Sequence, residues 1–208
     1  MEIADIPLIA GHPALDFTNA LEERATPAEI NYLPSYDHLL RWAARVGLVS
    51  VAAHKALARA ASDHPGKARK RWAEAMEFRR GLDAVFRALA KDKPPPEPAL
   101  RALNAMLSDA QAHRGLAPKS AGIITWAWDR PDALDIVAWE IALSAAGLMT
   151  DTDRCARIKI CGNPACDWMF LDESRTGQRR WCRMNVCGNE AKVRRFRARQ
   201  RGEPVDER

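Results

Sequence analysis

The spacing of apolar residues predicts that the first half of the chain is helical. After Ser35, apolar side chains recur at helical intervals and form one stripe, made of Leu39, Leu40, Trp42, Ala43 and Val46. Ser35 is a residue type that caps helix N-termini, and Gly47 is one at which helices end. An alanine-rich helix is predicted to begin after Ser50 and to end near residues 64–66, and a longer one is predicted over residues 67–91.

The middle of the chain changes pattern. Residues 91–98 contain four prolines and cannot be helical, because proline lacks the amide donor and restricts the residue before it. A short helix is predicted over residues 99–113. Residues 121–128 are rich in β-branched and aromatic side chains, which favours a strand in a hairpin with residues 115–119. Residues 131–149 are apolar almost all round, as in a helix buried within a domain.

A polar segment at residues 150–157 marks the predicted domain boundary. We therefore expect a helical N-terminal domain with a small β-hairpin over residues 1–152, a cysteine-rich domain over residues 153–203, and a tail at 204–208. The predicted fold class is α+β, mostly α.

Basic residues are concentrated at one end of the chain. Residues 1–153 carry 18 basic and 20 acidic side chains, whereas residues 154–208 carry 14 basic and 7 acidic ones. A clustered positive field attracts phosphate groups, so this asymmetry predicts a polyanion-binding module on a neutral body. A solvated basic face is the alternative.

Membrane and secretion signals are not recognisable in the sequence. The uncharged run at residues 141–150 has ten residues, about half of what a membrane span needs. Residues 1–17 are acidic and lack the basic region and long apolar stretch of a secretory signal. We therefore expect a cytoplasmic protein with no membrane contact, in which thiols stay reduced and paired cysteines are metal ligands or redox groups.

Four cysteines follow the pattern C-x4-C-x15-C-x4-C, formed by Cys161, Cys166, Cys182 and Cys187. Four thiolates in two close pairs are the usual ligands of a closed tetrahedral site, so the pattern predicts one structural Zn²⁺ ion. The alternatives are ordinary buried cysteines, a redox pair, which usually has two intervening residues, or a catalytic zinc, which needs an open position. Cys155 has no partner at ligand spacing and is expected to be a packed residue.

The residues around the cysteines have two expected roles. Aromatic residues between the pairs are expected to form a small apolar core, although stacking on bases is the alternative; they are Trp168, Phe170 and Trp181. Small or rigid residues in the loops are expected to let the backbone bend around the metal; they are Gly162, Pro164 and Gly188.

The segment after Cys187 is predicted to be a basic helix, with Val193 and Phe196 on its inner side. Arginines on a helix beside a zinc module suit contacts with phosphate and guanine, and such binding weakens steeply with salt. A solvated charged helix is the alternative. The residues predicted to bind nucleic acid are Arg179, Arg180, Arg183, Lys192, Arg194, Arg195, Arg197, Arg199 and Arg201.

Two segments carry a family resemblance: GHPALDFTNAL at residues 11–21, and the cysteine-rich stretch from CGNPAC through RRWC to CGNEAKVRR. Together they resemble the CGNR zinc-finger family, bacterial proteins with an N-terminal ABATE domain. The resemblance implies a stress-linked transcription regulator with a treble-clef-like DNA-binding finger and a helical sensor domain. The sequence departs from the family's namesake motif at Glu190, where arginine is expected, so a DNA contact or an internal ion pair should differ there.

A ligand pocket in the helical domain is predicted around His12, Asp16 and Asn19. Asp16 and Asn19 are three residues apart and share one helical face. The alternative is a polar pair that ties neighbouring loops together.

The predicted function is therefore a DNA-binding transcription regulator whose N-terminal domain senses a small-molecule effector or forms a homodimer, because one small module buries little DNA surface. The alternatives are an RNA- or protein-binding zinc module, or an enzyme with its site in the N-terminal domain. No G-x-S-x-G, P-loop or H-E-x-x-H motif is present, so we expect no enzyme activity.

Overall fold

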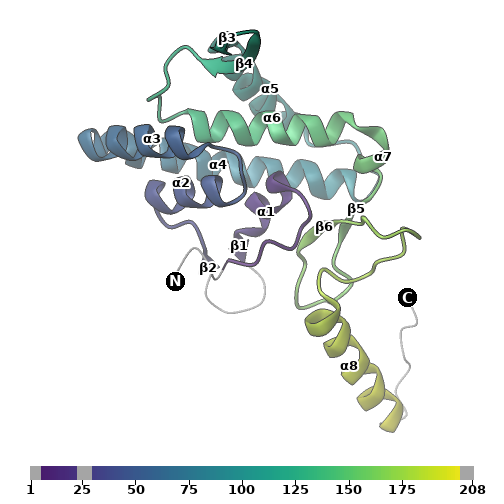
Figure 1. Cartoon of the computed structure of the whole chain (residues 1–208). Coiled ribbons are helices and arrows are strands. Elements are labelled where there is room, and N and C mark those ends of the chain that lie inside the picture. Colours follow the sequence, from purple (N-terminus) through teal and green to yellow (C-terminus); the bar gives the residue numbers. More distant parts are fainter. Residues whose placement is uncertain (1–5, 23–29, 202–208) are drawn as a thin grey trace.

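The computed structural model of the protein describes residues 6–22 and 30–201, so the predicted tail at 204–208 lies outside the described residues. Helices make up most of the fold (Figure 1). They are α1 (Pro13–Asn19), α2 (Tyr36–Arg45), α3 (Val51–Asp63), α4 (Pro65–Leu89), α5 (Glu97–Ala112), α6 (Ile136–Thr150), α7 (Thr152–Cys155) and α8 (Asn189–Gln200), with a π-helical turn, η2 (Met184–Gly188), before α8.

The described strands form three separate antiparallel pairs. These pairs are β1 (Leu21–Glu22) with β2 (Ile30–Asn31), β3 (Arg114–Ser120) with β4 (Ile123–Trp128), and β5 (Ile158–Ile160) with β6 (Met169–Leu171). The predicted fold class, α+β and mostly α with four clustered cysteines near the C-terminal end, is confirmed.

The ends of α2 follow the sequence signals. The Ser35 hydroxyl caps the helix by accepting a hydrogen bond from the His38 amide at 3.3 Å. At the other end Gly47 has φ +77°, the left-handed conformation that glycine adopts without strain. The Leu48 amide then reaches back to the Ala43 carbonyl at 2.9 Å, which closes the helix.

The other predicted elements of the body are present with shifted ends. The buried helix begins at Ile136 rather than at residue 131, because residues 130–136 form successive turns, with the Ala133 amide bonded to the Arg130 carbonyl. The helix predicted over residues 67–91 begins at Pro65, where proline suits the first helical position. The helix predicted over residues 99–113 begins at Glu97, so the prediction that all of residues 91–98 are non-helical is wrong at its end, because Pro98 lies in the first turn, where the missing amide is not needed. The predicted hairpin is confirmed as β3 and β4.

One apolar core holds the helices together. α6 packs against α1, α2 and α5, and its buried side chains include Trp139 and Leu148. Phe17 of α1 packs on Trp42 of α2 with ring centroids 5.5 Å apart. The buried Arg79 lies over the Phe17 ring and donates to Asn31 Oδ1 at 3.1 Å, so its charge is bound inside the core.

The β5–β6 hairpin joins the helical body to the cysteine-rich region. Ile158, Met169 and Leu171 belong to the core of the body, whereas Phe170 belongs to a second cluster around the cysteines. Successive strand residues point to opposite faces, so one face of the short hairpin packs in the core of the body and the other packs in the cluster around the cysteines. The body and the metal-binding region therefore share an interface that the division at residues 152 and 153 does not reveal.

Within residues 6–22 and 30–201, no helix combines the length and the apolar character needed to cross a membrane.

Candidate metal centre and basic surface

The sulfur atoms of Cys161, Cys166, Cys182 and Cys187 all lie within 4.8 Å of one another. The Cys182 sulfur is 3.5 Å from that of Cys166 and 3.6 Å from that of Cys187. A tetrahedron of sulfurs at about 2.3 Å from a zinc ion has edges of about 3.8 Å, so these separations fit such an ion. Cys155 is not part of the cluster and packs against the core of the body, as expected.

Backbone hydrogen bonds hold the two cysteine loops together. The Cys182 amide donates to the Cys161 sulfur at 3.4 Å, and the Gly162 amide donates to the Arg180 carbonyl at 2.8 Å. Hydrogen bonds from Cys166 and Cys182 lower the pKa of Cys161, whereas the same contacts with Cys161 raise the pKa of Cys166 and Cys182. The close thiols share protons, and a divalent cation is the natural counter-charge for four thiolates.

The glycines of the loops have a different role from the one predicted. Neither Gly162 nor Gly188 has a positive φ, so the backbone there does not need glycine for its bend. A Cβ on Gly162 would lie 3.1 Å from the Arg180 carbonyl oxygen, and one on Gly188 would lie 2.5 Å from the Met184 sulfur. At Gly162 a Cβ would therefore press on the backbone of the other cysteine loop, whereas at Gly188 it would meet the flexible end of the exposed Met184 side chain, which can move aside.

The predicted aromatic core of the metal-binding region is confirmed. Trp168 and Phe170 are buried beside the cysteines, and Trp181 packs against them. Two residues of the body join this cluster: Ile9, and Tyr32, whose ring meets Trp168 edge-on at 6.5 Å. The aromatic side chains are thus occupied by packing rather than presented for base stacking.

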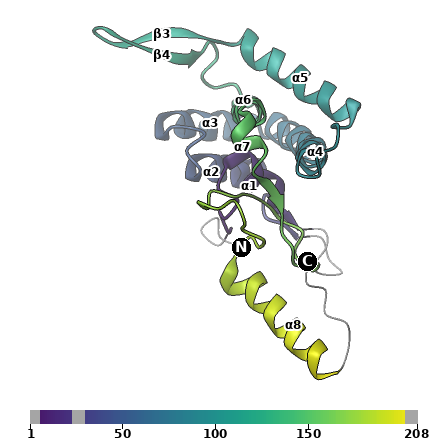
Figure 2. The same cartoon turned by 90° about the vertical axis from the view of Figure 1, so that its right-hand side faces the viewer.

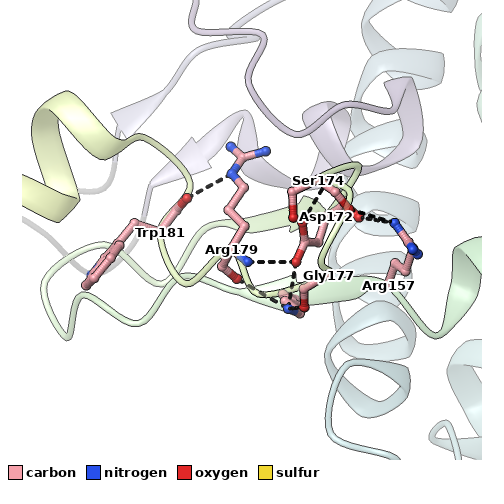
Figure 3. Close-up of polar contacts among 7 residues, drawn as sticks. Arg157, Asp172, Ser174, Gly177, Arg179 and Trp181 are labelled. Atoms are coloured by element: carbon pink, nitrogen blue, oxygen red, sulfur yellow. Dashed lines mark hydrogen bonds and ion pairs between the residues drawn. The ribbon is translucent and has the colours of Figure 1, made fainter. Parts of the chain in front are cut away.

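A fully buried carboxylate, Asp172, organises the loop between the second and third cysteines (Figure 3). Its oxygens accept hydrogen bonds from Lys159 Nζ at 2.7 Å, from the Ser174 amide and hydroxyl, and from the Arg179 amide at 2.9 Å. Burial alone would raise the pKa of Asp172, but these hydrogen bonds hold it well below its usual range. No sequence signal predicted this role, because Asp172 lies among other polar loop residues.

Arg179 supports the metal centre from inside. Its Nε donates to the Trp181 carbonyl at 3.0 Å, its Nη2 donates to the Cys182 carbonyl, and its guanidinium lies 4.3 Å from the centre of the Phe170 ring. Figure 3 shows this side chain reaching toward the Trp181 backbone. The structure therefore gives Arg179 internal partners, and its contact with nucleic acid stays a prediction.

The helix α8 leaves the rest of the molecule and extends away from it (Figures 1 and 2). Ala191 is its one buried residue. Val193 and Phe196, predicted to face inward, are 47% and 61% exposed, so that prediction is wrong. In the second turn of the helix, Arg194 still donates to Asn163 and Arg195 lies over the Trp181 ring. Its exposed basic residues are Lys192, Arg194, Arg197, Arg199 and Arg201.

The remaining predicted basic residues lie at the base of α8. Arg180 and Arg195 both lie over the Trp181 ring, at 5.3 and 5.9 Å from its centre, and Arg183 is exposed between the two last cysteines. The structure thus brings the predicted basic residues together along one helix and its base, apart from the internally bound Arg179.

Glu190 takes part in an internal polar network. Its Oε2 accepts a hydrogen bond from Nδ2 of the buried Asn163 at 2.6 Å, and Asn163 Oδ1 accepts one from Arg194 Nη1 at 3.0 Å. The first turn of α8 is thereby tied to the loop between Cys161 and Cys166. Asn163 was not singled out from the sequence, although each cysteine pair carries an asparagine two residues after one of its ligands.

The residues of the predicted ligand pocket bind backbone groups. Asp16 accepts hydrogen bonds from the Ile9 and Ala10 amides at 3.1 and 3.0 Å, and Asn19 pairs with the backbone of Met169. His12 accepts a hydrogen bond from the Ala14 amide and caps α1; burial, and then the nearby Arg154, lower its pKa to about 4. The structure favours the alternative, in which these side chains tie loops together.

A cavity of about 580 Å³ lies elsewhere, between α2, α3 and α4. Its lining is mostly apolar and includes the buried Leu40 and Ala68, with Ala61 and Trp72 partly exposed. Arg69 is the one cation among the described lining residues. Asp37, which also lines the cavity, forms an ion pair with Arg41 on the next turn of α2.

Two family models match the chain in the order expected from the sequence. Residues 157–200 match the CGNR zinc finger, and residues 11–152 match ABATE, described as "Putative stress-induced transcription regulator". No curated protein matches the chain. Because the ABATE match covers more than half of its residues, the chain belongs to the ABATE family, and it carries a CGNR zinc finger after the ABATE region.

Proposed function

We propose that this protein is a transcription regulator that binds DNA through α8 and the basic residues at its base, with one structural zinc ion in the cysteine cluster. The exposure of α8 carries the proposal. Only Ala191 is buried along the helix, and the π-helical turn that contains Cys187 leads directly into it. A basic helix anchored at one end and open on all other sides is suited to enter the DNA major groove, which is about 12 Å wide.

The donor set favours zinc. Four sulfur ligands at tetrahedral separations suit Zn²⁺ and leave no coordination position open for water or substrate. Bound there, the ion would hold the two cysteine loops in place, and nearby side chains would connect these loops to α8. Cys187 fixes the start of α8, Arg179 supports the backbone at Cys182, and Asn163 joins the first loop to the helix.

The exposed side chains of α8 fit the chemistry of a groove. The arginines suit phosphate oxygens and the acceptor edge of guanine, and the apolar Val193 and Phe196 suit thymine methyl groups. Exposure of two apolar residues on so basic a helix is expected for a contact surface and is costly for a merely solvated one.

The test is a salt-dependent binding measurement on the full chain with duplexes of different sequence. We expect one duplex sequence to bind more tightly than random DNA, and the affinity to fall steeply with salt. Replacing Arg197 and Arg199 together by glutamine should weaken binding and flatten the salt dependence. The matched control replaces the exposed Arg59 and Lys67 of α3 and α4 by glutamine and should bind as the wild type does.

Two outcomes would contradict the proposal. Equal or tighter binding to single-stranded or duplex RNA would favour the alternative RNA-binding module. A lack of binding to any nucleic acid, together with full zinc occupancy, would favour a protein-binding module.

Sensing of a small molecule by the helical body is the second part of the proposal. The cavity between α2, α3 and α4 has a volume within the usual range of about 300 to 1,000 Å³ for small-molecule sites. Its lining is mostly apolar and includes the cation Arg69, so it suits an amphipathic molecule that carries an anionic group. This cavity replaces the region around Asp16 and Asn19 as the candidate effector site.

A further inference from the structure

The β3–β4 hairpin reaches well beyond the helical body (Figures 1 and 2). Its root is anchored, because the Trp128 ring packs on Trp139 of α6 with centroids 5.0 Å apart. Past this root the hairpin exposes four large apolar side chains by more than half of their surface. They are Leu116 (67%), Ile123 (54%), Ile124 (69%) and Trp126 (59%).

Most of these side chains share one face of the hairpin. Leu116 lies opposite Trp126, and Pro118 lies opposite Ile124. Directly paired residues, and residues two apart along a strand, point to the same side of a sheet. The same face continues at the root with Trp128, which is already packed on α6. The apolar face of the core therefore extends outward into solvent along the hairpin.

The two edges of the hairpin differ. On β3, Pro118 lacks an amide donor and the register shifts between Pro118 and Ser120, features that protect an edge from further pairing. β4 (Ile123–Trp128) contains no proline, no irregularity and no charged residue. The hairpin therefore has one protected edge and one open edge.

We infer that the occupant of this surface is a second copy of the chain, with β4 of one copy paired antiparallel to β4 of the other about a two-fold axis. This pairing gives a four-stranded sheet whose outer edges are the two protected β3 strands. The sheet is closed and stops at two copies, because each β3–β4 hairpin has one open edge to offer. Isolated two-stranded hairpins are marginally stable, so a four-stranded sheet stabilises the hairpins of both copies.

Charge also favours a second copy over a charged partner. Residues 114–128 contain no carboxylate, and their two cations lie away from the centre of β4. Arg114 packs over the Trp126 and Trp128 rings at the root, and Lys119 lies near the turn. In the antiparallel arrangement the apolar tip of each hairpin comes to lie beside the partner's root. A hairpin offers less than the roughly 800 Å² per partner of a standard interface, so we expect a dimer that dissociates on dilution.

The inference identifies the surface of a homodimer, at the end of the molecule opposite α8, and it does not depend on the proposed function (Figures 1 and 2). The test is sedimentation of the zinc-loaded full chain over a range of concentrations. We expect the wild type to shift from monomer to dimer, and Trp126→Lys to stay monomeric. Val51→Lys is the matched control, because Val51 is 75% exposed on α3, and it should behave as the wild type does.

A second variant and a second measurement guard against misfolding. Ile124→Lys should also be monomeric, and both variants should keep the wild-type helical circular dichroism. Hydrogen exchange at the β4 amides should slow with rising protein concentration in the wild type alone. A wild type that stays monomeric at every concentration, or a dimer that both variants leave intact, would overturn the inference.

DNA binding separates this inference from the proposed function. A monomeric wild type that binds one duplex selectively refutes the hairpin dimer and leaves the function standing. A hairpin-dependent dimer that binds no DNA supports the inference and refutes the function.

Discussion

The side-chain amide of Asn19 pairs with the backbone of Met169, donating from Nδ2 to the carbonyl oxygen at 2.8 Å and accepting at Oδ1 from the amide at 3.0 Å. The two residues are 150 positions apart, in α1 and β6. The Asn19 side chain thereby forms with β6 the pair of hydrogen bonds that a neighbouring strand would form. One buried side chain thus bonds the first helix of the ABATE region directly to the hairpin of the zinc finger.

Replacing Asn19 by leucine should destabilise the whole fold. The substitution leaves a buried amide and a buried carbonyl of Met169 without partners, and each such group costs about 1 to 3 kcal/mol. We expect a loss of about 2 to 5 kcal/mol in urea unfolding followed by circular dichroism. Asn104→Leu on the exposed face of α5 is the control and should change little. A loss as small as that of the control would show that Asn19 does not fasten the two regions.

Local sequence signals predicted the elements that depend on neighbouring residues. Ser35 and Gly47 mark the ends of α2, and the β-branched and aromatic residues of 121–128 mark β4, because caps, turns and strands are set by residues close in the chain. The cysteine cluster was predictable for the same reason, since its ligands come in two close pairs. The partners of Asn19 and Asp172 were not predictable, because they depend on long-range packing.

The error at Val193 and Phe196 has a related cause. Apolar residues on a helix usually mark its buried side, but burial requires another element to pack against. In this chain α8 extends beyond the rest of the fold, so the same pattern lies in solvent.

Asp16 should make stability depend on pH. Burial raises its pKa to about 6 from an ordinary value of 3.8, although the Ala10 and Ile9 amides and Arg45 oppose the shift. A carboxyl whose pKa is raised on folding stabilises the fold fully below about pH 4, and that contribution is lost as pH rises through about 6. The difference amounts to about 3 kcal/mol.

The Asp16→Asn variant tests this dependence, because asparagine can accept the same two amide bonds without ionising. Urea unfolding between about pH 4 and pH 7 should show a flatter profile for the variant, which gains stability relative to the wild type as pH rises. Asp132→Asn, an exposed change, should leave the wild-type slope in place. Parallel profiles for the wild type and Asp16→Asn would contradict the raised pKa.

Removal of the metal should loosen the cysteine loops and α8 while leaving β5 and β6 in place. The hairpin is held from the body side by Asn19, by the Leu171 amide bonded to the Ala10 carbonyl at 2.7 Å, and by its buried side chains. The link between Cys182 and Cys161 depends on the cluster itself. Hydrogen exchange after chelation should therefore keep the Met169 and Leu171 amides protected and expose those of Cys182 and Gly188. Equal loss of protection at all four would show that the hairpin needs the metal.

Filling the cavity between α2, α3 and α4 should abolish binding of an amphipathic anion. Dodecanoate is a suitable probe, because it combines an apolar chain with a carboxylate for Arg69. Calorimetric titration should show saturable binding to the wild type, weaker binding to Arg69→Gln and none to Ala61→Trp. Ala73→Trp, an exposed change on α4 outside the lining, should bind as the wild type does. Unchanged binding by Ala61→Trp would place the probe elsewhere, for example on the exposed hairpin.

We expect Glu190 to stabilise the zinc finger and, at the same time, to weaken its binding to DNA. Its carboxylate accepts from Asn163, which in turn accepts from Arg194, so in both contacts a donor faces an acceptor. Arginine, the family residue, has only donors. If Asn163 turned its oxygen toward an arginine at position 190, its amide nitrogen would face the Arg194 guanidinium. Glu190→Arg should therefore lower the stability of the finger in thermal unfolding.

The same substitution should strengthen DNA binding, because it removes an anion from the first turn of α8 and adds a cation there. We expect the logarithmic salt dependence to steepen by about one ion. Glu190→Gln separates the two effects, since its amide oxygen still accepts from Asn163 while the charge is lost. It should keep the wild-type unfolding temperature and bind DNA moderately more tightly. If Glu190→Arg bound DNA no better than Glu190→Gln, the side chain at position 190 would act only on the internal network, and the start of α8 would lie outside the DNA contact.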